Sequence, residues 1–213
     1  MSETLTIDIG TDTAYARINN GHIVEVAKLR LATQAELSAQ QKLGKNRTLD
    51  IRFPRFLSFL RAQLNSSVNR IVFEDVQFLG SQYATQLWGS LRGAIWAAVC
   101  ECKSPGVQIY IVPSTLLKYF ATGKVNSHKI DMAKALALAD PEKYQLDSSM
   151  ELYRAGNKIN DDEIDAIWLA RFTLAVDRGE QKFRLVPNTI AIARKKCVNR
   201  EVRKQKTIIT SYL

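Results

Sequence analysis

Short segments with a β pattern open the chain, and strand-like and helix-like segments follow each other further along. Residues 4–10 alternate polar and apolar side chains, the period of a strand with one buried face, and the β pattern recurs over residues 14–18 and 22–31. Asn19, Asn20 and Gly21 form a tight-turn signal between the last two segments. The sequence therefore predicts an antiparallel meander of three strands.

The remaining segments predict helices alternating with buried strands. We expect helices over residues 52–64, 85–102, 114–120, 127–139 and 161–176, and strands over residues 70–73 and 107–112. Residues 32–47 are polar and predict a loop or a short exposed helix. Strands that alternate with helices pair in parallel. The expected fold class is therefore α/β, a mixed sheet in which the meander is joined by parallel strands and flanked by helices.

Positive charge is concentrated near the carboxyl end. Residues 181–213 contain nine Lys or Arg and one Glu, so this segment carries +8 of the formal net charge of +9. We expect a folded domain over residues 1–178 and a basic extension over residues 179–213. The extension, including Lys195 and Lys196, either binds DNA through phosphates, serves as an assembly arm or is a solvated tail.

The sequence predicts a reduced, intracellular and cytoplasmic protein with no membrane partner. It contains no apolar run of about 18 residues, the length that a membrane-spanning helix requires. Its first residues lack the basic flank and apolar block of a secretory signal. Its three cysteines are too few and too clustered for a disulfide framework, and their spacing fits no zinc site.

Carboxylates occur where the pattern predicts buried strands. Asp8 lies within the first apolar strand, and Glu74 ends the strand that contains Ile71, Val72 and Phe73. An ionised carboxylate is costly to bury unless it is paired or bound to metal. If the two strands are parallel neighbours, both carboxylates lie at the same end of the sheet, where ligands usually bind.

A third acidic group opens the last predicted helix. Asp162 and Asp165 are three residues apart and therefore share one helical face, which continues to Leu169. Taken singly, each acid has a structural explanation: a turn cap for Asp8, a salt bridge for Glu74, a dipole-favoured helix start for the last group. Together they favour a site for two Mg²⁺ or Mn²⁺ ions, which prefer carboxylate oxygens and, roughly 4 Å apart, activate water for phosphodiester cleavage.

The order of these motifs resembles that of the RuvC-like Holliday junction resolvases, a family of the ribonuclease H-like superfamily. The resemblance covers about residues 4–176. The matching segments are residues 7–10 (IDIG), 72–75 (VFED), 87–93 (LWGSLRG), 111–129 and 162–166 (DEIDA). No single segment is decisive, but their joint order is fairly specific.

The resemblance implies a ribonuclease H-like fold and a RuvC-like nuclease domain over residues 1–178. It also implies a homodimer that makes symmetric, metal-dependent nicks in branched DNA such as a four-way junction. The residues that it places in metal binding are Asp8, Glu74, Asp162 and Asp165. These four and Lys129 would be catalytic, and the matched residues that would contact DNA are Lys118, Lys129 and Arg92. On residue type alone, Lys118 and Lys129 are ordinary surface lysines.

The chain departs from the family at one functional position. The family often places an aromatic wedge three residues after the second acidic residue, whereas this chain has Gln77 there and Phe78 immediately after. Phe78 is either a wedge with a shifted register or an ordinary hydrophobic residue. The predicted helix over residues 85–102 likewise supplies either the dimer interface or part of the core.

Two other function classes also match parts of the sequence. Asp8, Ile9, Gly10 and Thr11, followed by Thr13, resemble the first phosphate loop of actin-like and sugar-kinase-like ATPases. However, the chain holds one such domain, whereas those proteins need two, and a second phosphate motif is missing. The other class is a non-catalytic scaffold that binds branched DNA. Within the nucleases, broad activity on flaps, forks or hybrids is a further alternative.

Overall fold

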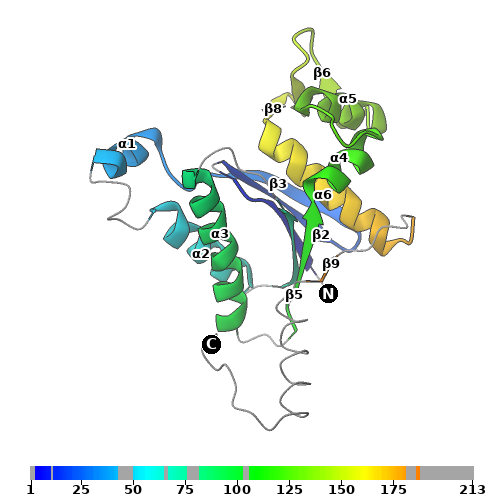
Figure 1. Cartoon of the computed structure of the whole chain (residues 1–213). Helices are drawn as coiled ribbons and strands as arrows, with labels where there is room; N and C mark the ends of the chain where they lie inside the picture. Colours follow the sequence, from blue (N-terminus) through cyan, green and yellow to red (C-terminus); the bar gives the residue numbers. More distant parts are fainter. Residues whose placement is uncertain are drawn as a thin grey trace.

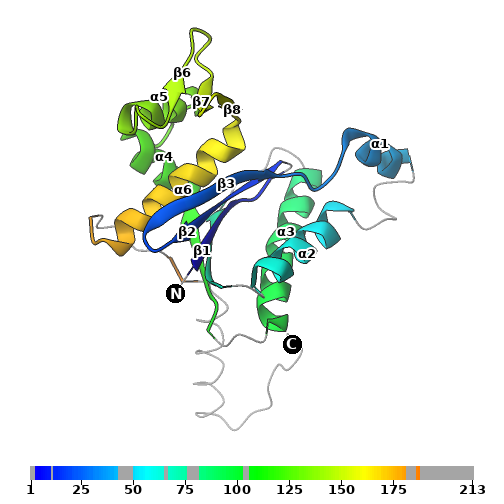
Figure 2. The ribbon, with the colours of Figure 1, turned by 180° about the vertical axis from the view of Figure 1, so that it is seen from behind.

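The computed structural model describes residues 3–10, 12–42, 50–64, 67–75, 82–102, 106–180 and 186–187. These residues form a mixed sheet in the order β3-β2-β1-β4-β5-β9, with helices on both faces (Figures 1 and 2). Its strands are β1 (Glu3–Asp8), β2 (Thr13–Asn19), β3 (His22–Leu29), β4 (Val68–Asp75), β5 (Gln108–Pro113) and β9 (Val186–Pro187). The helices are α1 (Gln34–Lys42), α2 (Arg52–Leu64), α3 (Gln82–Glu101), α4 (Ser114–Thr122), α5 (Lys129–Ala139) and α6 (Asp161–Asp177).

The predicted meander and the parallel strands are confirmed. β1 pairs antiparallel with β2, and β2 pairs antiparallel with β3. The turn between β2 and β3 contains Asn20 and Gly21, whose φ values are 50° and 76°. Positive φ at both central residues is typical of a hairpin turn whose twist matches that of its strands. β1 pairs in parallel with β4, and β4 with β5. The expected α/β fold class, a mixed sheet flanked by helices, is therefore the observed one.

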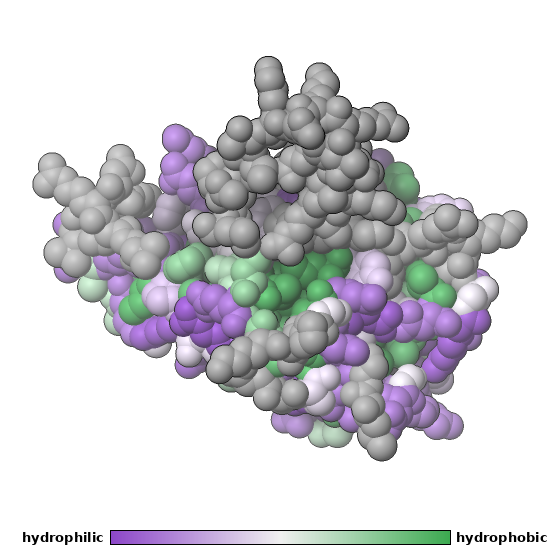
Figure 3. Space-filling view, turned by 90° about the horizontal axis from the view of Figure 1, so that it is seen from below, coloured by the Kyte–Doolittle hydropathy of each residue, from purple (hydrophilic) through white to green (hydrophobic). Residues whose placement is uncertain are grey.

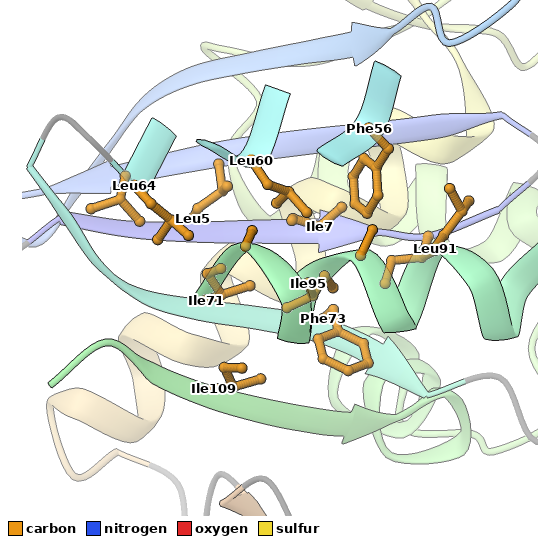
Figure 4. Close-up of a cluster of buried hydrophobic side chains, with 14 of the residues drawn as sticks. Leu5, Ile7, Phe56, Leu60, Leu64, Ile71, Phe73, Leu91, Ile95 and Ile109 are labelled. Carbon is orange, nitrogen blue, oxygen red and sulfur yellow. The ribbon is translucent and has the colours of Figure 1, made fainter. Parts of the chain in front are cut away.

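One face of the sheet packs against α2 and α3. Leu5 and Ile7 of β1 and Ile71 and Phe73 of β4 point to this face and are fully buried. Figure 4 shows these side chains meeting those of the two helices, among them Phe56, Leu60, Leu64, Leu91 and Ile95. Full burial of one such side chain stabilises the fold by about 1.5–3 kcal/mol. The helix predicted over residues 52–64 is confirmed.

The opposite face packs against α4, α5 and α6. Val72 of β4 and Val112 of β5 join Leu169 and Phe172 of α6 in a second core. Thr6 of β1 also faces α6, and its Oγ1 donates a hydrogen bond to the carbonyl oxygen of Ala166 (3.4 Å). Successive strand residues point to opposite faces, so Asp8 and Glu74 lie on the α6 side.

A second, small sheet, which was not predicted from the sequence, joins α5 to α6. It consists of β6 (Gln145–Leu146), β7 (Leu152–Arg154) and β8 (Asn157–Ile159), all antiparallel. Figure 1 shows it beside α5 and the amino-terminal end of α6. Its sharp turns include Met150 and Ala155, whose φ values are 63° and 49°.

Several boundaries differ from the predicted ones. α5 begins at Lys129 because His128 is its N-cap, with a hydrogen bond from the His128 N–H to Oδ2 of Asp131 (3.0 Å). Residues 34–42 form the short helix that was one of two expectations for the polar segment. Residues 186–187 of the expected extension pair with β5, and the rest of the extension past Glu180 lies outside the described residues.

The two ends of the molecule differ in character. The carboxyl ends of β1, β4 and β5 and the start of α6 lie at the upper end in Figure 1. Figure 3 looks at the lower end, where a hydrophobic area is bordered by hydrophilic residues. Among the helices that the structure describes, none is both long and apolar enough to cross a membrane.

Candidate metal centre

Three carboxylates from three elements converge at the upper end of the sheet. They are Asp8 at the end of β1, Glu74 near the end of β4 and Asp165 in the second turn of α6. One oxygen atom of each lies within 4.8 Å of the other two, and all three residues are buried. The structure thus brings together three of the four acids that the sequence predicted as metal ligands.

The local fold explains why these three side chains meet. Ile7 of β1 is in register with Phe73 of β4, so the next residues, Asp8 and Glu74, lie side by side on the other face. The phase of α6 is set at its start by Asn160, whose Oδ1 accepts a hydrogen bond from the Glu163 N–H (2.9 Å). The Asn160 N–H in turn donates to Oε2 of Glu163 (3.1 Å). Glu163 is therefore a cap, and the next turn directs Asp165 toward the sheet.

Lys129 provides the direct positive charge at this cluster. It is the first residue of α5, and its Nζ forms an ion pair with Oδ2 of Asp165. Its side chain is 42% exposed, whereas that of Asp165 is 9% exposed. The ammonium group therefore lies between the buried carboxylates and solvent.

Burial and mutual repulsion disfavour the ionised carboxylates. Burial raises the pKa of Asp8 well above its ordinary value, the charge of Glu74 raises it further, and Lys129 opposes the shift. Burial also raises the pKa of Glu74, against the charges of Lys129 and Lys118. Among the described residues, the three acids thus share one directly paired lysine, so the negative charge of the cluster exceeds its positive charge.

The donor set fits a divalent cation of the Mg²⁺ or Mn²⁺ type. Hard cations bind carboxylate oxygens, and the three acids present such oxygens within reach of a single ion. A divalent charge would also offset the repulsion that raises the pKa of Asp8 and Glu74. Geometry and electrostatics both favour metal binding here.

The fourth predicted ligand, Asp162, stands apart from the three. Its Oδ2 lies 3.8 Å from Nζ of Lys28, and the same Nζ lies 3.0 Å from Oδ1 of Asp12. Burial raises the pKa of Asp162, and the charge of Lys28 opposes this shift. Asp162 still acts on the cluster, because its charge contributes to the raised pKa of Asp8. Lys28 and Asp12 were not predicted from the sequence; the pairing of β2 with β3 brings Lys28 beside Ala14, two residues after Asp12.

Arg92, predicted to contact DNA, lies on the other face of the sheet. Its Nη1 is 3.5 Å from Oδ1 of Asp75, which points away from Glu74. Its guanidinium lies 5.0 Å from the ring centres of both Trp88 and Trp96, a cation–π arrangement. Arg92 therefore does not join the carboxylate cluster.

The other predicted DNA contacts divide into two groups. Lys118, on α4, lies on the same side of the sheet as the cluster, where its charge opposes the raised pKa of Glu74. Gln77, Phe78, Lys195 and Lys196 fall outside the described residues. Their roles remain predictions.

Solved structures with this fold include two of RuvC from Thermus thermophilus. One, described as a complex with a Holliday junction substrate, has a TM-score of 0.58 and 12% sequence identity. The other has a TM-score of 0.56 and 13% identity. Each match covers 87% of this chain and 99% of the RuvC chain. No family model and no curated protein sequence matches this chain. The likeness confirms the expected fold, the ribonuclease H-like α/β fold of RuvC.

Proposed function

We propose that this protein is a metal-dependent, structure-selective DNA endonuclease that resolves four-way junctions by symmetric phosphodiester nicks. The buried convergence of Asp8, Glu74 and Asp165 beside Lys129 carries this proposal. The likeness to RuvC, one structure of which is described with a Holliday junction substrate, supports the choice of branched DNA.

The acidic residues would hold two Mg²⁺ or Mn²⁺ ions. When bound, such ions activate a water molecule and stabilise the leaving oxygen, which gives a 5′-phosphate and a 3′-hydroxyl without a covalent enzyme intermediate. Asp8, Glu74 and Asp165 form the primary ligand set because their oxygens already lie together. Asp162 would be a further ligand from the first turn of α6, once its contact with Lys28 is exchanged.

Lys129 would act on the phosphate rather than on the metal. Its ammonium group is at the solvent-facing side of the cluster, where a mobile point charge can approach a non-bridging phosphate oxygen. There it stabilises the negative charge that develops during attack. Lys118, on the neighbouring helix α4, would contact the DNA backbone.

The proposed enzyme acts as a homodimer. A four-way junction has near two-fold symmetry, and two active sites related by a two-fold axis nick opposed strands. α3 is the candidate interface helix, since Trp88 and Trp96 are only partly buried within one chain.

A synthetic four-way junction, end-labelled on each strand in turn, tests the proposal. We expect paired nicks that require Mg²⁺ and disappear in Asp8→Asn. The control is Glu101→Gln, which removes an exposed carboxylate paired with Arg61 and should cleave like the wild type. Junction binding without cleavage in Mg²⁺ or Mn²⁺ would favour a scaffold instead. A protein that does not bind the junction would contradict the whole proposal.

A further inference from the structure

A cavity of about 650 Å³ opens directly beside the metal centre. Its walls come from the start of α5, the start of α6 and the small sheet of β7 and β8. Lys129 and Asp162 line it, so it is continuous with the proposed catalytic site. None of the carboxylates that converge at the metal centre is needed to form it.

The cavity combines an apolar floor with an exposed apolar rim. Leu152, Ile159 and Ile164 form the floor and are buried. Ile130 and Met150, on the rim, are 44% and 45% exposed. Ile130 projects from α5, and Met150 from the turn before β7. Two exposed aliphatic side chains beside a charged centre favour an apolar or flat aromatic ligand, because covering them removes apolar surface from water.

The charges on the walls disfavour a phosphate inside the cavity. Four carboxylates line it, those of Asp12, Glu151, Asp161 and Asp162, against the two lysines Lys129 and Lys158. Lys158 is already paired with Glu151. A nucleobase carries no charge and has N–H groups that can donate hydrogen bonds to carboxylates, so these walls accept a base more readily than a phosphate.

We propose that this cavity receives an unstacked nucleobase adjacent to the scissile phosphate, held between Ile130 and Met150. The inference rests on the proposed nuclease function, which places the phosphate at the metal centre. The attached base then lies next to the phosphate, where Lys129 and Asp162 border both sites. A chain that binds the base in this way selects DNA with unpaired or weakly stacked nucleotides, because extracting a base from intact duplex costs more free energy.

Fluorescence of 2-aminopurine tests the proposal, because this base brightens when it leaves the stack. It is placed singly at each position around the exchange point of a four-way junction, and the full chain is added in Ca²⁺. The test variant is the double substitution Ile130→Ala and Met150→Asn. Asn tolerates the positive φ of residue 150, and Ile130 is exposed, so the fold is expected to survive. The control is Leu138→Ala on the same helix, 83% exposed and away from the cavity.

The wild type and Leu138→Ala should brighten the probe at one position next to the mapped nick. The double variant should lose this signal and cleave about tenfold more slowly, the effect of losing one base-stacking contact. The base pocket is overturned if the probe does not brighten with the wild type, or if it still brightens with the double variant. In either case the nuclease proposal stands as long as the Mg²⁺-dependent nicks persist. A wild type that neither binds nor cleaves the junction overturns both.

Discussion

Nζ of Lys28 lies 3.8 Å from Oδ2 of Asp162, the predicted metal ligand that is not part of the cluster formed by Asp8, Glu74 and Asp165. Lys28 comes from β3, at the far side of the meander, whereas Asp162 opens α6. The lysine also contacts Asp12 at 3.0 Å, so a bound metal ion would have to compete with it for these two carboxylates. We therefore expect Lys28 to limit how readily Asp162 joins a metal centre.

Replacing this lysine should strengthen metal binding. In Lys28→Met, Asp162 and Asp12 lose their positive partner, and we expect Mn²⁺ affinity to rise about fivefold, or roughly 1 kcal/mol, as for a partly exposed ion pair. Isothermal titration calorimetry of the metal-free protein with Mn²⁺ measures this affinity. Lys124→Met, which removes an exposed lysine beyond α4, should leave the affinity unchanged. Weaker Mn²⁺ binding in Lys28→Met would show that Lys28 supports the centre instead of competing with it.

Neutralising one buried carboxylate should stabilise the metal-free protein. Asp8→Asn removes a buried charge that is repelled by Glu74. We expect a gain of about 1–2 kcal/mol, which is roughly 2–8 °C in Tm for a chain of this size. Thermal unfolding followed by circular dichroism measures it. Mg²⁺ should raise the Tm of the wild type but not of Asp8→Asn. A lower Tm for metal-free Asp8→Asn, with Glu101→Gln unchanged, would contradict the electrostatic description of the cluster.

The stabilising effect of Asp8→Asn should depend on pH in a defined direction. The pKa of Asp8 is raised in the folded protein, so its protonation favours folding. The stabilisation that protonated Asp8 gives the wild type is fully present below pH 3.8, the ordinary pKa of the side chain, and is lost as the pH rises through the raised pKa. The variant's advantage in Tm should therefore be smallest near about pH 4 and should grow as the pH is raised toward about 8. An advantage of the same size at both ends of this range would show that repulsion is not its cause.

Lys129 should affect the rate of cleavage more than DNA binding. We expect Lys129→Met to slow single-turnover cleavage about 10²–10³-fold, because it removes the charge that stabilises the developing negative charge. Junction affinity in Ca²⁺ should change little, since one phosphate contact among many is lost. Lys134→Met, an exposed lysine on the same helix, is the control. A rate within threefold of the wild type would remove Lys129 from the mechanism.

The sequence was sufficient to predict the carboxylates on the strands and the helix. Asp8 and Glu74 are carboxylates in segments that the sequence predicts as buried strands, and the parallel pairing of β1 with β4 brings them together. Asp165 was predicted from the DEIDA segment, and it lies within residues 164–170 of α6, all of which are buried.

Other parts of the site depended on contacts that the pattern does not contain. The three-residue spacing of Asp162 and Asp165 predicted one shared face, but this spacing contains no sign of the contact between Asp162 and Lys28, which comes from a distant strand. β7 and β8 have three residues each, too few to show a period, so the wall of the base pocket was not predictable. Arg92 stands at the position that the family's spacing predicts, but it pairs with Asp75, which lies on the face of the sheet opposite to the carboxylate cluster.

Cleavage of a junction with sulfur in place of a non-bridging oxygen at the scissile phosphate tests the central claim most directly. If Asp8, Glu74 and Asp165 hold metal against that phosphate, sulfur should slow cleavage in Mg²⁺, which prefers oxygen, and Mn²⁺ should restore the rate at least tenfold. The unmodified junction should show no comparable gain from Mn²⁺. Equal rates in Mg²⁺ for the oxygen and sulfur junctions, for both phosphorothioate diastereomers, would contradict a metal centre that acts on the scissile phosphate.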